Sequence, residues 1–278
     1  MISIIIPTYN NLEYLKLCIK SLKINSHYNH EIIFHINDGS DGTVEFVKSC
    51  GYKFTHSQNN IGLCSSINKA AKLASFDYLL YSHDDMYFCP YWDDVLIKEI
   101  KQIDHENFYL SGTMIEANSG HIVCNFGDTI NNFKEDELLL KYKNINFYDH
   151  QGTHFAPHLV SKKMWNKVGG FSEEFNPGIA SDPDFNMKLW KLGVRNFKGL
   201  NDFKVYHFSS VTTRKKKELI VNRGERTFLK KWGISTKFFK KYYLKSGSRY
   251  IGPLKEPIKD VFYYKDLLIC KIKKIFII

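Results

Sequence analysis

The sequence predicts an α/β protein built on a mostly parallel, Rossmann-like central sheet, with helices on its faces and a basic, helical carboxyl-terminal extension. Three observations lead to this fold class. Short apolar runs alternate with helix-patterned segments four times within roughly the first 85 residues. The runs are nearly continuous, as in strands that are buried on both faces. Clusters of Asn, Asp, Gly and Ser follow the runs and mark turns.

The amino-terminal half supplies the alternating pattern. Strands are predicted at residues 2–7, 31–38, 52–57 and 76–82, and helices at 12–23, 42–50 and 61–74. The first run stops at Pro7, and the second stops at the turn-forming sequence NDGSDG. We therefore expect three crossover helices between four parallel strands.

The pattern changes from about residue 105. Strands are predicted at residues 107–117, 121–129 and 203–208, a loop with a helix at 131–144, and helices at 161–171 and 181–193. The last helix has the clearest boundaries: Asp182 lies near its start, Pro183 in its first turn and Gly193 at its end.

Charge divides the chain into a body and an extension. Residues 211–278 hold 19 Lys and Arg against 5 Asp and Glu, whereas residues 1–210 hold 20 against 24. We predict one domain over 1–210, with a nucleotide-binding half at 1–104 and an acceptor-binding half at 105–210, followed by the basic aromatic extension at 211–278.

Composition excludes several classes of protein. With 44% hydrophobic and 24% charged residues in 278, the chain is neither disordered nor fibrous. No apolar run reaches the ~18 residues that a membrane-spanning helix needs. The six cysteines form no CxxC motif, and no secretory signal is evident, so we interpret the cysteines as reduced and the protein as cytoplasmic.

Polar clusters follow three of the predicted strands: PTYNN at 7–11, NDGSDGT at 37–43 and SHDDM at 82–86. Open parallel sheets bind ligands at the carboxyl ends of their strands. The chain has neither GxGxxG nor GxxxxGK[ST], so the phosphates of a nucleotide would need another cation. Asp84 and Asp85 are candidates to hold Mg²⁺ or Mn²⁺ there. A helix cap or a solvated turn would account for the acid pair as well.

Seven segments in a fixed order resemble glycosyltransferase family 2, whose fold is called GT-A. They are IIIPTYNN (4–11), NDGSDGT (37–43), NNIGLCSSINKA (59–70), LLYSHDD (79–85), GGFSEEF (169–175), SDPDFNMKLWKLG (181–193) and VYHFSS (205–210). Each segment alone is weak evidence, but together they cover about residues 1–210.

The resemblance implies roles for individual residues. Asp182 is in the position of the catalytic base, with Asp184 as a competing candidate. Asp84 is in the position of the last acid of the family's Asp-x-Asp metal motif. The residues implied in nucleotide binding are Pro7, Thr8, Tyr9, Asn10, Asp38, Asn60, Gly62, Asn68, His83 and Asp84. Those implied in metal binding are Asp84, Asp85 and His207.

Some of these residues could instead serve the fold alone. Asp182 could cap its helix, because Asp is a preferred N-cap residue. Tyr9 could be a core aromatic, and His207 a structural histidine. His154 and His158 could face the acceptor or serve packing alone. The motif also departs from the family, because Ser82 replaces its first acid.

The resemblance implies an inverting sugar transfer, assisted by Mg²⁺ or Mn²⁺, from a nucleoside-diphosphate sugar to a hydroxyl of a glycan or lipid-linked acceptor. A UDP-sugar is the favoured donor. Arg214, Lys215 and Lys216 are placed to close over its diphosphate, although a solvated basic run would account for them as well. The alternatives are a nucleotide-sugar-binding protein without turnover and a metal-dependent nucleotidyltransferase. A nucleic-acid partner is not expected, because the basic segment has no recognisable groove-reading or base-stacking motif.

The extension interleaves lysines with aromatic residues and ends in DLLICKIKKIFII (266–278). Such a sequence suits the surface of an anionic membrane, which would make the protein peripheral on the inner face of the membrane. Helices that pack on the catalytic domain through their aromatic residues would produce the same pattern.

Overall fold

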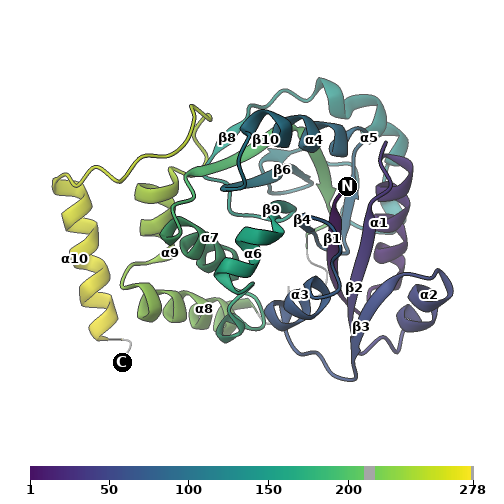
Figure 1. Ribbon diagram of the computed structural model, residues 1–278, viewed down its shortest axis with the longest axis horizontal. Coiled ribbons are helices and arrows are strands. Elements are labelled where there is room, and N and C mark those ends of the chain that lie inside the picture. The colour runs from purple at the N-terminus through teal and green to yellow at the C-terminus, as the bar shows by residue number, and fades with distance from the viewer. Residues whose placement is uncertain (210–216, 277–278) are drawn as a thin grey trace.

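Ten strands form one mixed sheet in the computed structural model, which describes residues 1–209 and 217–276, with side chains left out for 217–222 (Figure 1). The strands are β1 Ser3–Tyr9, β2 Glu31–Asn37, β3 Lys53–Ser57, β4 Tyr78–Tyr81, β5 Met86–Phe88, β6 Phe108–Glu116, β7 Ile122–Val123, β8 His150–Gln151, β9 His158–Ser161 and β10 Asn196–His207. The main order is β3-β2-β1-β4-β9-β6-β10-β5.

The amino-terminal part of the sheet is parallel, and the remainder is mixed. Strands β3, β2, β1 and β4 run in one direction. Strand β9 inserts antiparallel between β4 and β6, and β5 and β8 pair antiparallel with β10. The predicted α/β fold class is therefore confirmed, with antiparallel strands added in the second half.

The sheet opens between β1 and β4. The two strands pair only from Ser3 to Ile5 of β1, whereas β1 pairs with β2 as far as Tyr9. Strand β4 ends at Tyr81, so the carboxyl end of β1 extends beyond its neighbour on that side. Such divergence at strand ends leaves room for a ligand.

Helices cover both faces of the sheet (Figure 1). They are α1 Leu12–Ile24, α2 Thr43–Ser49, α3 Leu63–Ala71, α4 Trp92–Ile103, α5 Glu135–Lys141, α6 Lys162–Val168, α7 Ser181–Lys191, α8 Lys217–Trp232, α9 Thr236–Phe238 and α10 Val261–Ile275. A π-helical turn at Phe239–Leu244 follows α9, and 3₁₀ turns lie at Ile130–Asn132, Tyr142–Asn144 and Glu173–Phe175.

Most predicted elements are present, with shifts of a few residues at their ends. The exceptions are mostly strands whose pairing partners lie far away in the sequence. The strand predicted at 121–129 is only β7, and the strand predicted at 203–208 extends back to Asn196 through an irregularity between Gly199 and Lys204. Elements α4, β5, β8 and β9 have no counterpart among the predicted ones. The α4 sequence, WDDVLIKEIKQI, carries a helical apolar spacing that would have revealed it.

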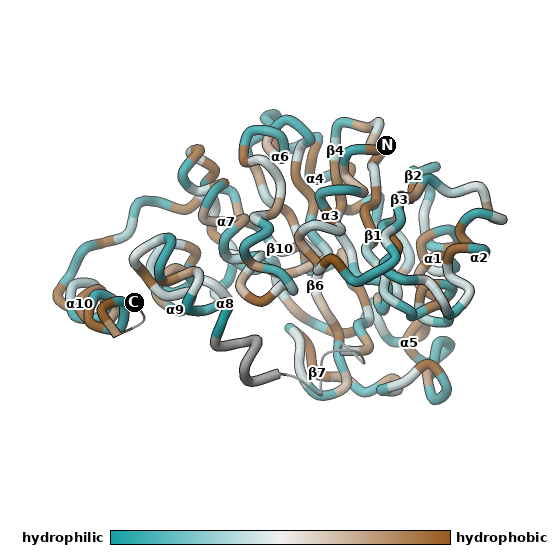
Figure 2. The backbone as a smooth tube through the Cα atoms, turned by 90° about the horizontal axis from the view of Figure 1, so that it is seen from below, coloured by the Kyte–Doolittle hydropathy of each residue, from teal (hydrophilic) through white to brown (hydrophobic). Residues whose placement is uncertain are grey.

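The carboxyl-terminal extension packs on the body. Phe228, Phe239 and Leu244 are buried in the same hydrophobic cluster as the strands of the sheet. Helix α10 lies farther out, at the left of Figures 1 and 2. Among the described helices, none combines the length and apolar character required to cross a bilayer. Residues Arg214, Lys215 and Lys216 lie outside the described residues.

Candidate active site

The turns after β1 and β2 are tied together by one amide. Asn10 donates from Nδ2 to Asp38 Oδ2 at 3.0 Å, and its Oδ1 accepts from the Gly39 N–H at 2.8 Å. Asn10 and Asp38 both have positive φ, at 46° and 61°. Left-handed backbone at non-glycine residues is often held at functional sites. Hydrogen bonds thus join the two predicted nucleotide-binding turns into one edge.

Three of the predicted side chains lie at the end of β1. Pro7 and Thr8 are buried, and Tyr9 is 38% exposed, so Tyr9 is not a core aromatic. Desolvation raises the pKa of the Asp84 carboxyl to about 7, with the Asp85 charge adding to the rise and Thr8 and Asn11 opposing it. The end of β1 therefore lies against Asp84.

The start of α3 is organised by a residue from a distant loop. Asn176 Oδ1 accepts from the Cys64 N–H at 2.9 Å, and its Nδ2 donates to Ser65 Oγ at 2.8 Å. Gly62 has φ of 86°, and a Cβ there would lie 2.5 Å from the Asn176 side chain. Asn60 accepts from the Gly62 N–H at 2.9 Å. The turn needs glycine because of its conformation and this close approach.

Asn68 connects α3 to the GGFSEEF segment. Its amide exchanges two hydrogen bonds with the Phe171 backbone, each 2.8 Å long. Both ends of the side chain are therefore engaged inside the protein. Its predicted contact with the nucleotide stays a prediction.

Two histidines and one carboxylate converge after β4 and at the end of β10. One potential ligand atom from each of His83, Asp85 and His207 lies within 4.8 Å of the others. His207 Nε2 is 3.2 Å from Asp85 Oδ1, and His207 Nδ1 is 2.6 Å from Glu116 Oε1. Strand β10 brings His207 to this place by pairing with β5, where His207 lies opposite Met86. The predicted metal-binding residues are Asp84, Asp85 and His207, whereas this cluster contains His83 together with Asp85 and His207.

His207 supplies positive charge between the carboxylates of Asp85 and Glu116. Although burial opposes protonation, Asp85 and Glu116 raise the pKa of His207 to about 10. Burial likewise opposes ionisation of Asp85, but the charge and the hydrogen bond of His207 hold its pKa well below the usual range. Desolvation lowers the pKa of His83 to about 4, so its imidazole is neutral at physiological pH.

The donor set fits a divalent transition metal. Two imidazoles and a carboxylate suit a first-row transition-metal ion, whereas Mg²⁺ selects oxygen ligands. Glu116 would hold the ring of His207 from behind, as carboxylates commonly do for metal-bound histidines. Binding would displace the His207 proton, because only the neutral ring is a ligand. Ser82 is fully buried and its hydroxyl donates to the His83 carbonyl, so it does not face this cluster.

Asp182 is a half-buried carboxylate in the first turn of α7. The helix begins at Ser181 with Ala180 as its N-cap residue and without a side-chain cap, so Asp182 is not the N-cap. Its Oδ1 is buried without a hydrogen-bond partner and lies 3.9 Å from His158 Nδ1. Desolvation raises the pKa of Asp182 to about 7. A carboxylate with this pKa can exchange a proton near neutral pH.

A row of rings connects Asp182 to the histidine cluster. The buried Tyr81 ring lies 5.5 Å from His83 on one side and 5.1 Å from His158 on the other, between ring centroids. Neither ring nitrogen of His158 nor the Tyr81 hydroxyl has a hydrogen-bond partner. Unpaired buried polar groups mark places that a polar ligand or water would satisfy. His158 therefore lies beside the candidate base, where it can contribute to the acceptor side of the site as well as to packing.

Asp184 differs from Asp182 in every respect that bears on catalysis. Its carboxylate is fully buried and accepts from Ser172 Oγ at 2.6 Å and from Trp232 Nε1 at 2.8 Å. Lys231 Nζ lies 2.9 Å from the same carboxylate. These contacts hold the extension on α7, and they occupy both carboxylate oxygens of Asp184.

Sequence reasoning missed two residues of this region, Glu116 and Asn11. Glu116 is the last residue of β6. An acid at the carboxyl end of a predicted strand was the sequence signal that could have identified it as a site residue. Asn11 follows Asn10 in the PTYNN segment and lies near Asp84. His154 is buried and shares a 2.9 Å hydrogen bond with Ser246 of the extension, which gives it a packing role.

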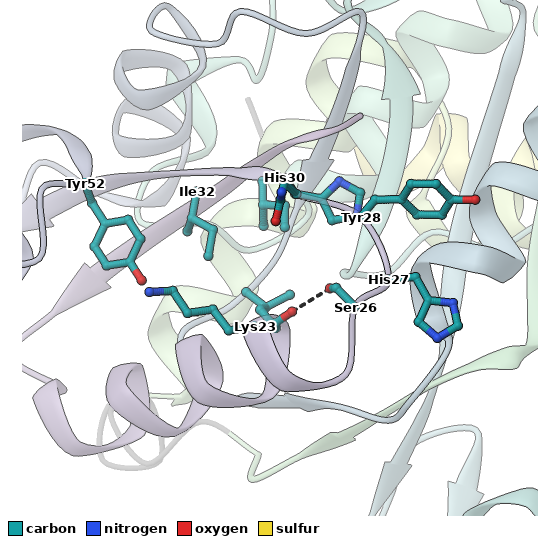
Figure 3. Close-up of a pocket in the computed structure, with 10 residues that line it drawn as sticks. Lys23, Ser26, His27, Tyr28, His30, Ile32 and Tyr52 are labelled. Atoms are coloured by element: carbon teal, nitrogen blue, oxygen red, sulfur yellow. Dashed lines mark hydrogen bonds between the residues drawn. The ribbon is translucent and has the colours of Figure 1, made fainter.

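A separate cavity of about 340 Å³ lies at the other end of the strands (Figure 3). It is lined by residues near the amino ends of β1 and β2, including Ile4 and Ile32. In Figure 3, Lys23 points toward Tyr52, and its Nζ lies 5.0 Å from the centre of that ring. The amino ends of strands are not where open α/β sheets bind substrates, so the strand-end cluster is the candidate active site.

Comparisons with known sequences point to one family. A model of glycosyl transferase family 2 matches residues 3–158. An uncharacterized glycosyltransferase of Rickettsia prowazekii is 29% identical over 200 residues, which cover 69% of this chain and 59% of that protein. An uncharacterized glycosyltransferase of Haemophilus influenzae is 26% identical, covering 68% and 62%. A hyaluronan synthase of Pasteurella multocida is 24% identical, covering 74% and 24%. The chain thus spans only about half of the Rickettsia relatives, or less.

The fold has known counterparts as well. A crystal structure of S. aureus TarS residues 1–349 superposes with a TM-score of 0.56 at 18% identity, covering 82% of this chain and 71% of that one. The same protein in complex with UDP-GlcNAc gives a TM-score of 0.56 and covers 82% and 65%. These structures establish a shared GT-A fold. The family model matches more than half of the chain, and so the chain belongs to glycosyl transferase family 2.

Proposed function

We propose that the protein transfers a sugar from a UDP-sugar to a hydroxyl group of a glycan or lipid-linked acceptor, with inversion at the anomeric carbon. The observation that carries this proposal is the environment of Asp182. Its Oδ1 has no hydrogen-bond partner, and its pKa lies near 7. The buried rings of His158 and Tyr81 connect it to the cluster of His83, Asp85 and His207. Family membership favours sugar transfer over nucleotidyl transfer.

The nucleotide half of the site is the joined edge of β1 and β2. Asn10 holds Asp38 in position, and the carboxylate of Asp38 would accept hydrogen bonds from the base or the ribose. Exposed Tyr9 offers a ring for stacking. The turn at Asn60 and Gly62 brings backbone close to the donor. The complexes of TarS with UDP-GlcNAc and with UDP support a uridine nucleotide as the donor class.

The diphosphate needs positive charge, which His83, Asp85 and His207 would supply by holding Mn²⁺, with Asp84 beside them. When bound, the ion neutralises charge on the departing diphosphate. Glu116 contacts His207 at Nδ1, which would leave Nε2 as the ring atom able to hold the ion. The position of Asp84, next to Asp85 in the chain and close to the end of β1, suits a second contact with the metal or with its bound water.

The chemical step would use Asp182 as the general base. The acceptor oxygen attacks the anomeric carbon as the bond from that carbon to the diphosphate oxygen breaks, and the electron pair leaves with the UDP. Asp182 takes the proton of the attacking hydroxyl. Attack opposite the leaving group inverts the anomeric configuration. His158, whose pKa burial lowers to about 3, is neutral and adds no charge that would depress the basicity of Asp182.

Calorimetric titration with UDP and Mn²⁺ tests the donor and metal assignments. Wild-type protein should bind UDP more tightly with Mn²⁺ than without it, and more tightly with Mn²⁺ than with Mg²⁺. His83→Gln and Asp84→Asn should each reduce the gain in UDP affinity that Mn²⁺ produces. His105→Gln, at an exposed histidine after α4, is the matched control and should change nothing. UDP binding that ignores Mn²⁺ would reject the metal assignment.

Turnover separates an enzyme from a protein that only binds the donor. Release of UDP from a UDP-sugar, measured with and without acceptor glycans, should depend on Asp182. If UDP binds with Mn²⁺ but no UDP-sugar in a panel is ever consumed, the non-catalytic alternative is correct.

A further inference from the structure

The outward face of α10 is an apolar stripe that the rest of the described protein leaves uncovered. Val261, Tyr264, Leu268, Ile272 and Ile275 follow one another at intervals of three or four residues, so they lie on one side of the helix. Each of them is between 46% and 73% exposed. Phe262, Ile269 and Phe276 are also exposed and border the stripe. Exposed apolar patches of this kind mark interaction surfaces.

The opposite face of α10 is fixed to the protein. Tyr263 and Cys270 are buried, at 5% and 4% exposure. Asp266 accepts hydrogen bonds from Lys241 Nζ at 2.8 Å and from the Tyr242 hydroxyl at 2.7 Å. Because these contacts fix the rotation of the helix about its axis, α10 cannot turn to bury the stripe without breaking them.

The charges around the stripe are positive. Lys265 and Lys271 of α10 are exposed and flank the stripe by helical spacing, and no acidic residue lies on the outward side of the helix. The acid within α10 is Asp266, which is engaged on the inward side. The extension as a whole carries 19 basic and 5 acidic residues. An apolar face whose flanking charges are positive complements an apolar surface that bears anions.

We propose that the outward face of α10 docks on the surface of a membrane containing anionic lipids. A 15-residue helix is about 22 Å long, too short to span a bilayer but long enough to lie in its interface. The stripe would enter the boundary of headgroups and acyl chains, and each lysine near the surface would add attraction to anionic lipid. A second copy of the chain fits less well, because pairing two such faces would bring their lysines together. The proposal does not depend on the catalytic assignments.

Co-sedimentation with lipid vesicles tests the docking face. The 278-residue protein should bind vesicles of phosphatidylcholine mixed with roughly one third phosphatidylglycerol, and bind pure phosphatidylcholine far more weakly. The double variant Leu268→Glu, Ile272→Glu should bind the anionic vesicles at least about tenfold more weakly, because two apolar side chains no longer enter the interface. Leu140→Glu is the matched control: Leu140 is 78% exposed on α5, and its replacement should leave binding unchanged.

The electrostatic part is tested separately. Lys265→Glu with Lys271→Glu should weaken binding to anionic vesicles, and high salt should weaken binding of the wild type. UDP release from a donor sugar in the absence of vesicles should be unchanged in both double variants, which distinguishes this proposal from the catalytic one. Failure of the wild-type protein to bind anionic vesicles overturns the proposal. So does a dimer, measured by light scattering, that the Leu268→Glu, Ile272→Glu variant breaks while vesicle binding persists.

Discussion

At the scale of single residues, Asp182 and Asp184 show how two acids on one helix turn acquire different properties. Their sequence positions differ by two, which turns the side chains to different sides of α7. Asp182 Oδ1 is buried without a hydrogen-bond partner, whereas Asp184 has three partners, Ser172, Lys231 and Trp232. The same residue type is therefore suited to proton transfer in one place and to holding the fold in the other.

The first prediction contrasts these two acids. Asp182→Asn should reduce turnover by about 10²–10⁴-fold, the usual contribution of a positioned general base, while UDP and Mn²⁺ binding persist. Asp184→Asn should instead lower the free energy of unfolding by about 1–3 kcal/mol, because a buried charge-assisted network loses its anion. Steady-state kinetics and urea denaturation measure the two effects. The opposite pattern, with normal turnover in Asp182→Asn and none in a folded Asp184→Asn protein, would assign the base to Asp184.

The second prediction concerns pH and uses the raised pKa of Asp182. The folded-state pKa, about 7, exceeds the ordinary value of 3.8, so the folded protein binds this proton more tightly than the unfolded chain does. The contribution of Asp182 to stability therefore falls as pH rises from about 4 to about 7 and stays low above that. Asp182→Asn removes this cost. The variant should match the wild type near pH 4 and exceed it by up to about 4 kcal/mol at pH 8.

Denaturant titrations at a series of pH values measure this difference. Turnover of the wild type should show the complementary trend, rising with pH through about 7 as the carboxylate ionises. A stability difference that does not vary with pH would mean that the carboxyl of Asp182 titrates normally and is not the base.

At the scale of elements, the active-site edge depends on loops that fix the starts of helices. The Cys64 N–H, in the first turn of α3, donates to Asn176, more than a hundred residues away. The sequence around α3 shows a helix but gives no sign of this partner, since no capping side chain is present at Gly62. This contact places the Asn60–Gly62 turn against Asn176, which directly follows the GGFSEEF segment.

The third prediction follows from that contact. Asn176→Ala should lower the free energy of unfolding by about 1 kcal/mol, the usual cost of losing a helix cap, and should weaken UDP binding because the Gly62 turn loosens. Thermal unfolding and calorimetric UDP titration measure the two quantities. Asn29→Ala, at an exposed asparagine before β2, is the control for the loss of an amide. Wild-type stability in Asn176→Ala would show that the helix does not depend on this partner.

At the scale of the whole molecule, the basic extension packs against the body that carries the candidate site. Trp232 donates to Asp184, and Phe228, Phe239 and Leu244 share one hydrophobic cluster with the sheet. Charge alone predicts the extension as a separate segment. The lysines of the extension determine its surface charge, whereas aromatic residues between them, such as Phe228 and Phe239, pack it against the sheet.

The fourth prediction is that extension and sheet unfold together. Urea denaturation followed by circular dichroism and by tryptophan fluorescence should give coincident single transitions. Trp232→Phe removes the hydrogen bond to Asp184. It should lower the free energy of unfolding by about 1–3 kcal/mol and shift both transitions to lower urea concentration. An early transition confined to the helical signal would show that the extension unfolds independently.

The sequence by itself determined the α/β class, the parallel amino-terminal strands and the residues at their carboxyl ends, because these follow from local apolar periodicity and from turn residues near in sequence. The strand-end position identified Asp84 as a candidate, whereas Asp38, Asp182 and His207 were identified through the resemblance to family 2. Their roles stay predictions until the variants are measured.

Only the tertiary structure decided which of those candidates meet. The antiparallel insertion of β9 brings His158 next to Asp182, and the pairing of β10 with β5 brings His207 next to Asp85. The metal-type cluster accordingly contains His83, and Glu116 enters from β6. Strand order and register between residues a hundred or more positions apart depend on the packing of the whole sheet, which no local pattern records. Desolvation, which sets the pKa of Asp182, is likewise a property of everything that surrounds the side chain.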